Sequence, residues 1–357
     1  MNYKEYIVKK AQGKNIVIWG MGSYGKASYD MLYSASIVVD FFCDMDEKKI
    51  GTKYRNILCI SYKEVLKFPN KYFVLIANQF LKEICTELEL NGFSKDGYNI
   101  IPSPYKIDFD CLLEKISNDV LNEKINIIND FLADKKSKDI LHKLQEVWFK
   151  NNISQNEFED IYDENQYFCE NIISIDDKTI YVDIGAYLGD SLKLFLKNSN
   201  GNFQKAICFE LNKSIFYKLC HFIHDLDSKT KNKIIAVNNG ISDKNQIVRY
   251  VDTEGSSHIG GDGNEIATLV TLDEYFKNDE IPTLIKMDIE GAELSALKGA
   301  EQIIKRYKPN LAICVYHKLQ DLWEIPEYIK SLVPEYKIYL RHHSNTMIET
   351  VCYAVMR

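Results

Sequence analysis

Two short apolar runs in this sequence each lead directly into a glycine-containing turn and then into a helical pattern. Residues 16–19 precede the turn GMGSYG at positions 20–25, and residues 180–184 precede GAYLGD at positions 185–190. A buried strand that turns over glycine into a helix is typical of parallel α/β sheets, in which the crossover helix packs back onto the strand. A chain of 357 residues is long enough for two domains. The sequence therefore predicts two α/β sheet domains.

The first expected domain covers residues 1–105. Apolar alternation predicts strands at 16–19, 37–43 and 72–77 and helices at 26–33 and 79–91. The turn completes the pattern G-x-G-x-x-G, and an aspartate follows about 20 residues later, as in dinucleotide-binding folds. The candidate nucleotide-binding residues of this Rossmann-like domain are Gly20, Gly22, Gly25 and Asp44. A Rossmann-like unit used only for packing or dimerisation is the alternative interpretation.

Apolar residues at helical spacing predict a helical connector over residues 106–170. Residues 171–357 return to the alternation of an α/β sheet and form the second expected domain. The pattern predicts seven strands there, at residues 180–184, 206–210, 234–237, 284–288, 310–316, 336–340 and 350–355. The glycine-rich stretch within 248–273 predicts a mobile loop or lid between the third and the fourth of these strands.

Composition narrows the classes of partner. Acidic residues number 51 and basic residues 44, so the formal charge of −7 argues against a nucleic-acid partner. Nine dispersed cysteines without a C-x-x-C pair favour reduced, buried thiols over a disulfide framework or a zinc site. The amino-terminal residues do not lead into a signal peptide, and no stretch approaches the roughly 20 apolar residues of a membrane span. A cytoplasmic protein is expected.

Acidic residues lie where strands of the second domain end. Asp183 precedes the glycine turn, and Glu210 ends the next strand, from which ribose hydroxyls are held in doubly wound folds. The third glycine of the dinucleotide spacing and a P-loop lysine are both missing, so an adenosine without phosphates fits better than a pyrophosphate. The alternative is that Gly185 and Gly189 only form a tight turn.

A second acidic group, Asp288, Glu290 and Glu293, spans a strand end and the first turn of a helix. Ligands of open α/β sheets bind at that edge, although Glu293 could equally compensate the helix dipole. His317 ends another strand, where an imidazole titrating near neutrality can act as a general base, and Asp321 follows it. The pair of histidines at 342 and 343 is a weaker version of this signal, and an exposed surface pair is the favoured interpretation there.

These features together closely resemble the FkbM-type S-adenosylmethionine-dependent methyltransferases. The resemblance covers roughly residues 165–357. It rests on VDIGA at 182–186, Glu210, Ser256 with Ser257, TLD at 271–273, IKMDIEGAELSAL at 285–297, and Tyr316 with His317. It implies a class I methyltransferase fold with a seven-stranded sheet and catalytic roles for His317 and Asp288. The cofactor-binding residues that it implies are Asp183, Gly185, Ala186, Tyr187, Gly189, Asp190, Glu210, Leu211, Asn239, Gly240, Ser242 and Asp288. The acceptor side would be formed by Ser256, Ser257, His258, Glu290, His317, Asp321 and His342.

The resemblance also implies S-adenosylmethionine as the cofactor and O-methylation of a sugar or glycan precursor of bacterial surface polysaccharide. Residues 39–51 look like the small Rossmann-like domains of bacterial surface-sugar-modifying enzymes, which implies a nucleotide-sugar or related ligand for the first domain. A homodimer is an option. The acidic edge at Asp288 and Glu290 could hold Mg²⁺ or Mn²⁺, although spacing fixes no ligand set.

Two other classes of protein stay open. One is a nicotinamide-dependent sugar-nucleotide oxidoreductase or epimerase built on residues 20–44. After the glycine turn, Tyr24, Tyr29 and Tyr33 are each followed four positions later by Ser28, Tyr33 and Ile37, so none of them forms the Tyr-x-x-x-Lys pair that would serve that chemistry. The other is a binding protein whose methyltransferase fold has lost its activity.

Overall fold

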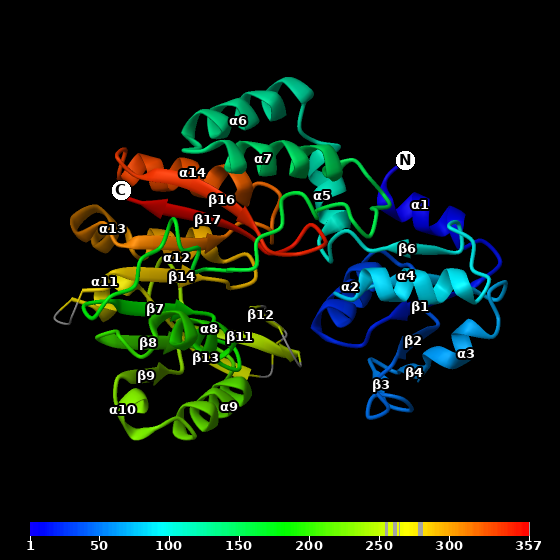
Figure 1. The fold of residues 1–357 in the computed structure, drawn as a ribbon, viewed down its shortest axis with the longest axis horizontal. Helices are drawn as coiled ribbons and strands as arrows, with labels where there is room; N and C mark the ends of the chain where they lie inside the picture. The colour runs from blue at the N-terminus through cyan, green and yellow to red at the C-terminus, as the bar shows by residue number, and fades with distance from the viewer. Residues whose placement is uncertain (254–255, 260–262, 264, 278–280, 357) are drawn as a thin grey trace. The chain divides into compact units, whose positions relative to one another are not determined.

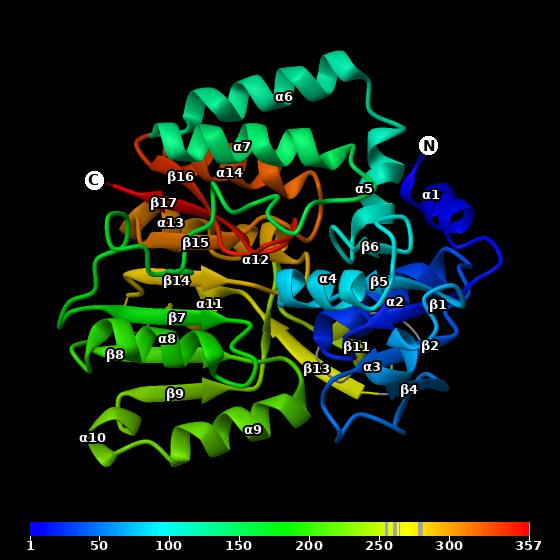
Figure 2. The same cartoon turned by 45° about the vertical axis from the view of Figure 1, so that its right-hand side comes forward.

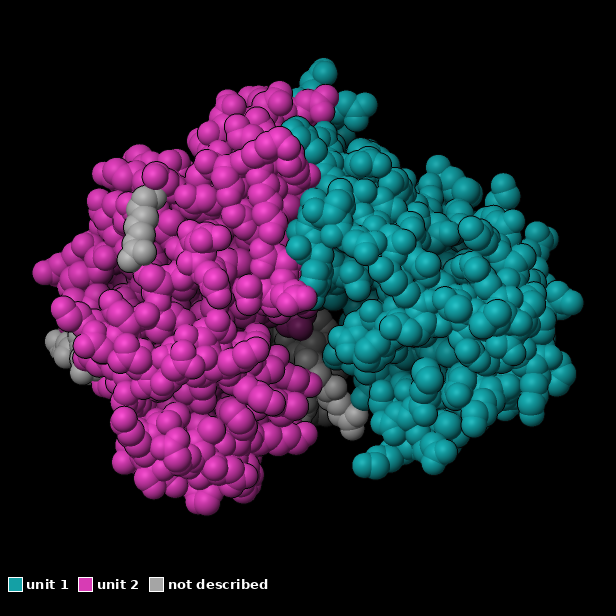
Figure 3. Space-filling model, in the orientation of Figure 1, with its two compact units in different colours: residues 1–121, 142–162, 344–348 teal, residues 122–141, 163–343, 349–357 magenta. Residues whose placement is uncertain are grey.

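The computed structural model describes residues 1–253, 256–259, 263, 265–277 and 281–356. The chain divides into two compact units, coloured separately in Figure 3. Unit 1 consists of residues 1–121, 142–162 and 344–348, and unit 2 of residues 122–141, 163–343 and 349–357. The segment expected as a connector, 106–170, therefore contributes residues to both units.

Unit 1 is built on a six-stranded sheet in the order β3-β4-β2-β1-β5-β6 (Figure 1). All neighbours pair in parallel except β3, which runs antiparallel to β4. The strands are β1 (Asn15–Trp19), β2 (Phe41–Asp44), β3 (Lys53–Tyr54), β4 (Ile57–Ser61), β5 (Tyr72–Ile76) and β6 (Tyr98–Ile100). From β1 the chain continues to β2, β3 and β4 on one side of β1, and it later forms β5 and β6 on the other side. The turn after β1 thus lies at the point where the strand order reverses, which is where open α/β sheets bind ligands.

Five helices precede, connect or follow these strands. They are α1 (Tyr3–Lys10), α2 (Ser23–Ser34), α3 (Tyr62–Leu66), α4 (Leu81–Leu90) and α5 (Lys106–Leu113). Two further helices, α6 (Asn118–Phe131) and α7 (Lys135–Trp148), contribute residues to both units.

Unit 2 contains a seven-stranded sheet in the order β16-β17-β15-β14-β7-β8-β9, with its strands side by side in Figure 2. The strands are β7 (Ile180–Ile184), β8 (Lys205–Phe209), β9 (Ile234–Val237), β14 (Leu284–Met287), β15 (Asn310–Cys314), β16 (Lys337–His342) and β17 (Thr350–Val355). Strand β17 runs antiparallel to both of its neighbours. The order reverses between β7 and β14, so this pair of strand ends is the ligand-binding position of the sheet. The predicted fold class is confirmed.

Most of the described residues between 240 and 270 lie in strands, so the prediction of a loop over 248–273 is wrong for them. Gly255, Gly260 and Gly261 lie outside the described residues, and the lid stays a prediction. Strands β10 (Gly240–Ile241), β11 (Gln246–Thr253), β12 (Ser256–Ile259) and β13 (Glu265–Val270) form a separate four-stranded sheet. Buried and exposed side chains alternate along the middle of β13, and Tyr250 of β11 is buried. A period of two residues is what a half-buried strand requires, so this alternation accounts for a strand in a stretch whose glycine content favoured a loop.

The helices of unit 2 are α8 (Asp190–Ser199), α9 (Lys213–His224), α10 (Ser228–Lys231), α11 (Leu272–Tyr275), α12 (Glu293–Lys298), α13 (Glu301–Tyr307) and α14 (Asp321–Leu332). Its core includes stacked rings of Tyr181 and Phe195, whose centroids lie 4.4 Å apart. None of the helices in the described part of the chain is long and apolar enough to cross a membrane.

Candidate active site

The glycine turn after β7 lies tightly against the ends of the two neighbouring strands. Gly185 has a φ of 79°, and a Cβ added to it would lie 2.0 Å from the carbonyl oxygen of Asp288. The amides of Gly185 and Ala186 both donate to the carbonyl of Phe209, each at 3.0 Å. Glycine is therefore required here by the close approach of the β7 and β14 turns.

A buried ion pair crosses the sheet directly below this turn. Lys286 of β14 lies 3.1 Å from Asp183 Oδ1 and donates to the carbonyl of Gly185 at 2.7 Å. The other oxygen, Asp183 Oδ2, accepts from Ser191 at 2.6 Å. Both charged residues are almost completely buried. Asp183 thus fixes β14 and the start of α8 against β7.

Glu210 follows β8 and holds the turns on both sides of it. Its Oε2 accepts from the amide of Tyr187 at 3.0 Å, and its Oε1 accepts from the amide of Asn212 at 2.8 Å. Burial raises the pKa of this carboxyl and outweighs the two backbone hydrogen bonds. A carboxylate oxygen accepts more than one hydrogen bond, so Glu210 keeps acceptor capacity for ribose hydroxyls.

Three other expected cofactor residues are Leu211, Asn239 and Gly240. Leu211 lies beside Glu210, and a Cβ on Gly240 would lie 2.7 Å from the Leu211 side chain, so this glycine serves packing. Asn239 is half-buried, whereas its neighbour Asn238 donates to the carbonyl of Glu210 at 2.8 Å.

Gly189 and Ser242 are engaged in packing. Gly189 has a φ of 89°, and its Cβ would lie 2.6 Å from Phe222 of α9. The hydroxyl of Ser242 lies 3.1 Å from that of Ser295 in α12. Asp190 is exposed at the first residue of α8.

Asp288 follows β14 and is held by two tyrosines. Its Oδ2 accepts from Tyr167 at 2.7 Å and its Oδ1 accepts from Tyr316 at 3.1 Å. Burial opposes the charged form of this carboxyl, but Lys286, His317 and the two phenols outweigh that effect and lower its pKa. Asp288 is therefore a carboxylate at neutral pH.

His317 lies beside Asp288, as the sequence predicts, but its surroundings differ from those of a neutral base. Its Nδ1 lies 2.9 Å from Glu293 Oε1, and its Nε2 lies 3.5 Å from Asp288 Oδ1 and 3.7 Å from Glu290 Oε2. Burial alone would lower the pKa of the imidazole, but these carboxylates, Glu293 first, raise it to about 10. The expectation of a histidine titrating near neutrality is therefore wrong.

Two further carboxyls in this region have pKa values near neutrality. Burial and the nearby Glu293 raise the pKa of Asp321 to about 7, and the amide of Lys318 donates to its Oδ2 at 3.1 Å. Burial and the nearby Asp288 raise the pKa of Glu349 to about 7. The end of the sheet at β14, β15 and β17 therefore has more carboxyls than cations.

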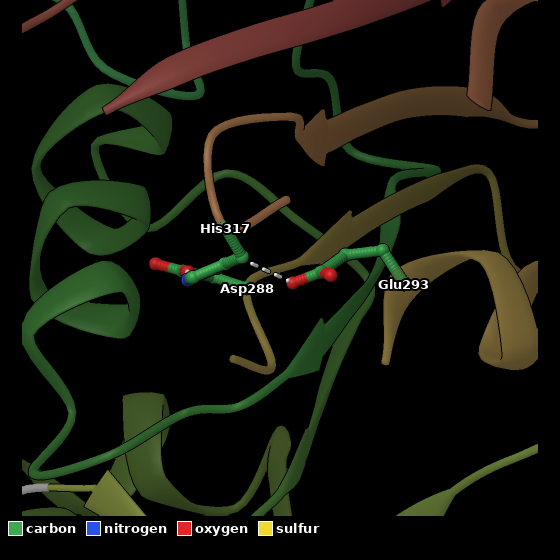
Figure 4. A group of neighbouring side chains, drawn as sticks. All are labelled: Asp288, Glu293 and His317. Atoms are coloured by element: carbon green, nitrogen blue, oxygen red, sulfur yellow. Dashed lines mark ion pairs between the residues drawn. The ribbon is translucent and has the colours of Figure 1, made fainter. Parts of the chain in front are cut away.

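A single divalent cation does not fit this cluster well. Asp288, Glu293 and His317 each offer one ligand atom, and these atoms lie within 4.8 Å of one another. The imidazole lies between the two carboxylates in Figure 4, with Nδ1 toward Glu293 and Nε2 on the side of Asp288. A cation on either ring nitrogen would have to replace the proton on that nitrogen and its ion pair with the carboxylate on that side. The chemistry of the donor set gives no support to Mg²⁺ or Mn²⁺.

Of the remaining expected acceptor residues, His342 is not brought to this cluster. His342 is completely buried in β16, with Nδ1 2.8 Å from the Thr350 hydroxyl. His343 is half-buried, and burial lowers its pKa to about 4. The expectation of an exposed histidine pair is thus wrong, because both rings pack against neighbours of β17. Ser256, Ser257 and His258 form β12, but their side chains lie outside the described residues.

The glycine turn of unit 1 contains glycines with different roles. A Cβ on Gly20 would lie 2.5 Å from the Ala77 carbonyl, and one on Gly25 would lie 1.8 Å from the Gly20 carbonyl. These two glycines permit close packing, whereas a Cβ on Gly22 would meet nothing within 4 Å. Asp44 Oδ2 accepts from the Met21 amide at 2.8 Å and from Lys49 at 2.9 Å. Asp44 therefore holds the turn itself.

Comparison with known proteins identifies the class of the fold. The structure is similar to the methyltransferase FkbM from Methylobacillus flagellatus KT, with a TM-score of 0.70 over 98% of this chain and 92% of that chain at 22% identity. Unit 2 thus has a class I methyltransferase fold. Residues 183–343 match the family model of the methyltransferase FkbM domain, so the chain carries an FkbM-type methyltransferase domain.

Other similarities cover parts of the chain. Residues 12–101 match the model of the C2185-like amino-terminal domain. An rRNA methylase from Streptococcus thermophilus is 18% identical and covers 51% of this chain and 90% of its own length, with a TM-score of 0.34. UDP-D-quinovosamine 4-dehydrogenase from Vibrio fischeri is 26% identical over 29% of this chain and 87% of its own length, with a TM-score of 0.22. No curated protein matches the chain.

Proposed function

We propose that the protein transfers a methyl group from S-adenosylmethionine to a hydroxyl of a sugar or glycan precursor. The proposal rests chiefly on the position of Glu210 and Asp288, two carboxyls at the strand ends beside the reversal point of an FkbM-type domain. Ligands of open α/β sheets bind at this position.

The residues present fit the cofactor. Glu210 would accept from the ribose hydroxyls, and the turn at Gly185 would carry the backbone close to the bound molecule. The bound cofactor supplies an electrophilic methyl group. The protein must then align the acceptor oxygen in line with it and exclude water, which are the main contributions of position and orientation to the rate.

Asp288 is the group that we assign to the acceptor hydroxyl. A hydroxyl is a poor nucleophile while it is protonated, and a carboxylate within hydrogen-bond reach can take its proton as the attack proceeds. Tyr167 and Tyr316 hold both oxygens of Asp288 in place. The polar groups around Asp288 favour an acceptor rich in hydroxyls over an apolar one.

For the first domain we propose a nucleotide-containing ligand at Gly20–Gly25. Support comes from the open space beside Gly22 and from helix α2, whose first turn has no side-chain cap. A nicotinamide-dependent oxidoreductase is the alternative for the same turn. A cytoplasmic location, a homodimer and the lack of a nucleic-acid partner stay predictions from the sequence.

Calorimetric titration of the full chain with S-adenosylhomocysteine, NAD and a nucleotide sugar tests these proposals. We expect the thioether product to bind at one site per chain, and Glu210→Gln to weaken it at least about tenfold, as the loss of one charge-assisted hydrogen bond implies. Glu170→Gln, at an exposed glutamate of the same unit, is the control. Binding of NAD without any binding of the thioether would overturn the methyltransferase proposal.

Transfer of labelled methyl groups to a panel of sugars and nucleotide sugars tests the acceptor. Labelling of a hydroxyl that depends on Asp288 supports it, with Asp288→Asn as the inactive comparison. Labelling of protein or nucleic acid in place of every sugar would contradict it.

A further inference from the structure

The His317 ring contacts carboxylates through both of its nitrogens. Nδ1 lies 2.9 Å from Glu293, and Nε2 lies 3.5 Å from Asp288 and 3.7 Å from Glu290. Figure 4 shows the ring between Asp288 and Glu293. Three carboxylates with an oxygen within 4.0 Å of a ring nitrogen favour the charged imidazolium over the neutral ring. This geometry therefore matches the protonated ring.

The burial of His317 and Glu293 also favours a protonated imidazole ring. The side chain of His317 is 2% exposed and that of Glu293 is fully buried. A buried carboxylate without a compensating charge costs several kcal/mol, and one of the Glu293 oxygens already accepts from the amide of Ile289 at 2.8 Å. A proton on His317 supplies the missing positive charge.

The charged groups that face His317 come from several elements. Besides the three carboxylates in contact, the charged groups whose field reaches the ring are those of Asp321 in α14 and Glu349 before β17. Lys286 acts on Asp288 from β14, and Lys318 follows His317 and donates to the Gly291 carbonyl. Carboxyls outnumber the cations in this set, so the field of the site stabilises the imidazolium.

We infer that His317 is a permanently protonated positioning residue, which ties the Asp288 turn to helix α12 and keeps Asp288 ionised toward the acceptor. This inference rests on the proposed function for the role of Asp288, but the protonation state of His317 does not depend on it. The turn needs such a tie because Glu290 and Gly291 both adopt left-handed backbone, with φ of 57° and 89°. A residue such as Glu290 in that conformation is strained and persists only where its surroundings hold it.

Nitrogen NMR of the full chain labelled at histidine tests the inference without any turnover. The chain has seven histidines, and the spectrum of His317→Gln identifies the signal of this one. At pH 8, well above the ordinary histidine pKa of about 6.5, both ring nitrogens should still be protonated. Addition of Mg²⁺ should leave the signal unchanged. A neutral tautomer at pH 8, or a shift of one nitrogen on addition of the ion, would overturn the inference.

Glu293→Gln provides a second route if His317→Gln does not fold. Removal of this carboxylate should shift the titration of one histidine signal to lower pH, toward the ordinary range. An unchanged set of histidine titrations would contradict the inference.

Kinetics separates positioning from base catalysis once an acceptor is found. The acid limb of the kcat profile, where Asp288 gains its proton, should move to higher pH in His317→Gln, because the imidazolium no longer favours the charged carboxylate. The plateau should be lower, and cofactor affinity should stay within about twofold. The exposed His221→Gln is the matched control and should behave as the unmodified protein. Loss of the pH-dependent rise in His317→Gln alone would identify His317 as the base.

Discussion

The ion pair between Asp183 and Lys286 is central to the carboxyl edge of the larger sheet. Lys286 reaches from β14 to a carboxylate on β7 and also holds the Gly185 turn through a backbone carbonyl. Strands β7 and β14, between which the strand order reverses, are therefore joined by this ion pair as well as by backbone hydrogen bonds. The pair therefore supports both the Gly185 turn, where the cofactor is expected, and the end of β14, where Asp288 would meet the acceptor.

Asp183→Asn should destabilise unit 2 by about 3–5 kcal/mol, because it leaves the charge of Lys286 buried without its partner. Urea unfolding of the full chain, followed by tryptophan fluorescence, measures this loss. The exposed Asp177→Asn should change the free energy of unfolding by no more than about 0.5 kcal/mol. Asp183→Asn combined with Lys286→Met should be more stable than Asp183→Asn alone. A double variant as unstable as the sum of its single changes would contradict the pairing.

Asp321 should make stability fall as pH rises toward neutrality. Its pKa is raised in the folded state, from an ordinary 3.8 to about 7, by burial and by Glu293. Its contribution to stability is therefore fully present below about pH 4 and is lost as pH rises through about 7. Asp321→Asn removes this loss, so its advantage over the unmodified protein should grow between pH 5 and pH 8, on the order of 2 kcal/mol. Denaturation midpoints at several pH values measure it, and a constant difference across that range would contradict the assigned pKa.

Sequence patterns identify the acidic residues of the site but not the groups that hold them. Glu210 and Asp288 were predictable because carboxyl ends of parallel strands meet at one edge. Tyr167 lies in a stretch without strand signals, 121 residues before its partner Asp288, so no local pattern could connect them. Lys286 lies within an apolar strand, and the strand pattern predicts only that this residue is buried. It does not predict the ion pair with Asp183. The protonation of His317 depends on Glu293, whose helix-terminal position has an ordinary electrostatic explanation.

At the scale of elements, glycines define where turns can approach one another. The apolar residues Ala292, Leu297, Ala300, Ile304 and Tyr307 have the spacing of one continuous helix, but the structure has two, α12 and α13, interrupted at Gly299. A Cβ on Gly299 would lie 1.9 Å from the Ser242 carbonyl. Periodicity describes which face of a helix is buried, but it does not reveal that a loop from elsewhere in the chain contacts the helix end.

Gly185→Ala should destabilise unit 2 far more than Gly201→Ala. Both glycines have left-handed backbone, with φ of 79° and 74°, but only the Gly185 Cβ would clash, whereas the Gly201 Cβ would meet nothing within 4 Å. The conformation alone costs about 1–2 kcal/mol, and the clash should add about 1–3 kcal/mol at Gly185. Chemical denaturation of both variants gives the difference. Equal losses would mean that the β7 and β14 turns do not approach as closely as the structure has them.

At the scale of the whole molecule, the boundary of unit 1 differs from the end of its sheet. The unit includes residues 142–162 and 344–348, far along the chain from residue 105. Asn99 of β6 donates to the carbonyl of Asn151 at 2.9 Å, and Tyr3 of α1 donates through its amide to Asp110 at 2.7 Å. Strand patterns locate a sheet, but they do not show which later segments complete its covering.

A fragment of residues 1–162 should accordingly be more stable than a fragment of residues 1–105. The shorter fragment loses the partners of Tyr3 and Asn99 and the buried side chains of Phe158 and Ile161. Each large apolar side chain contributes about 1.5–3 kcal/mol when buried, and 1 kcal/mol corresponds to about 4–8 °C in a domain of this size. Circular dichroism should therefore show a melting temperature at least about 10 °C lower for the shorter fragment, or no cooperative transition. Equal melting temperatures would mean that residues 106–162 add nothing to the unit, and that the sheet alone is the folding domain.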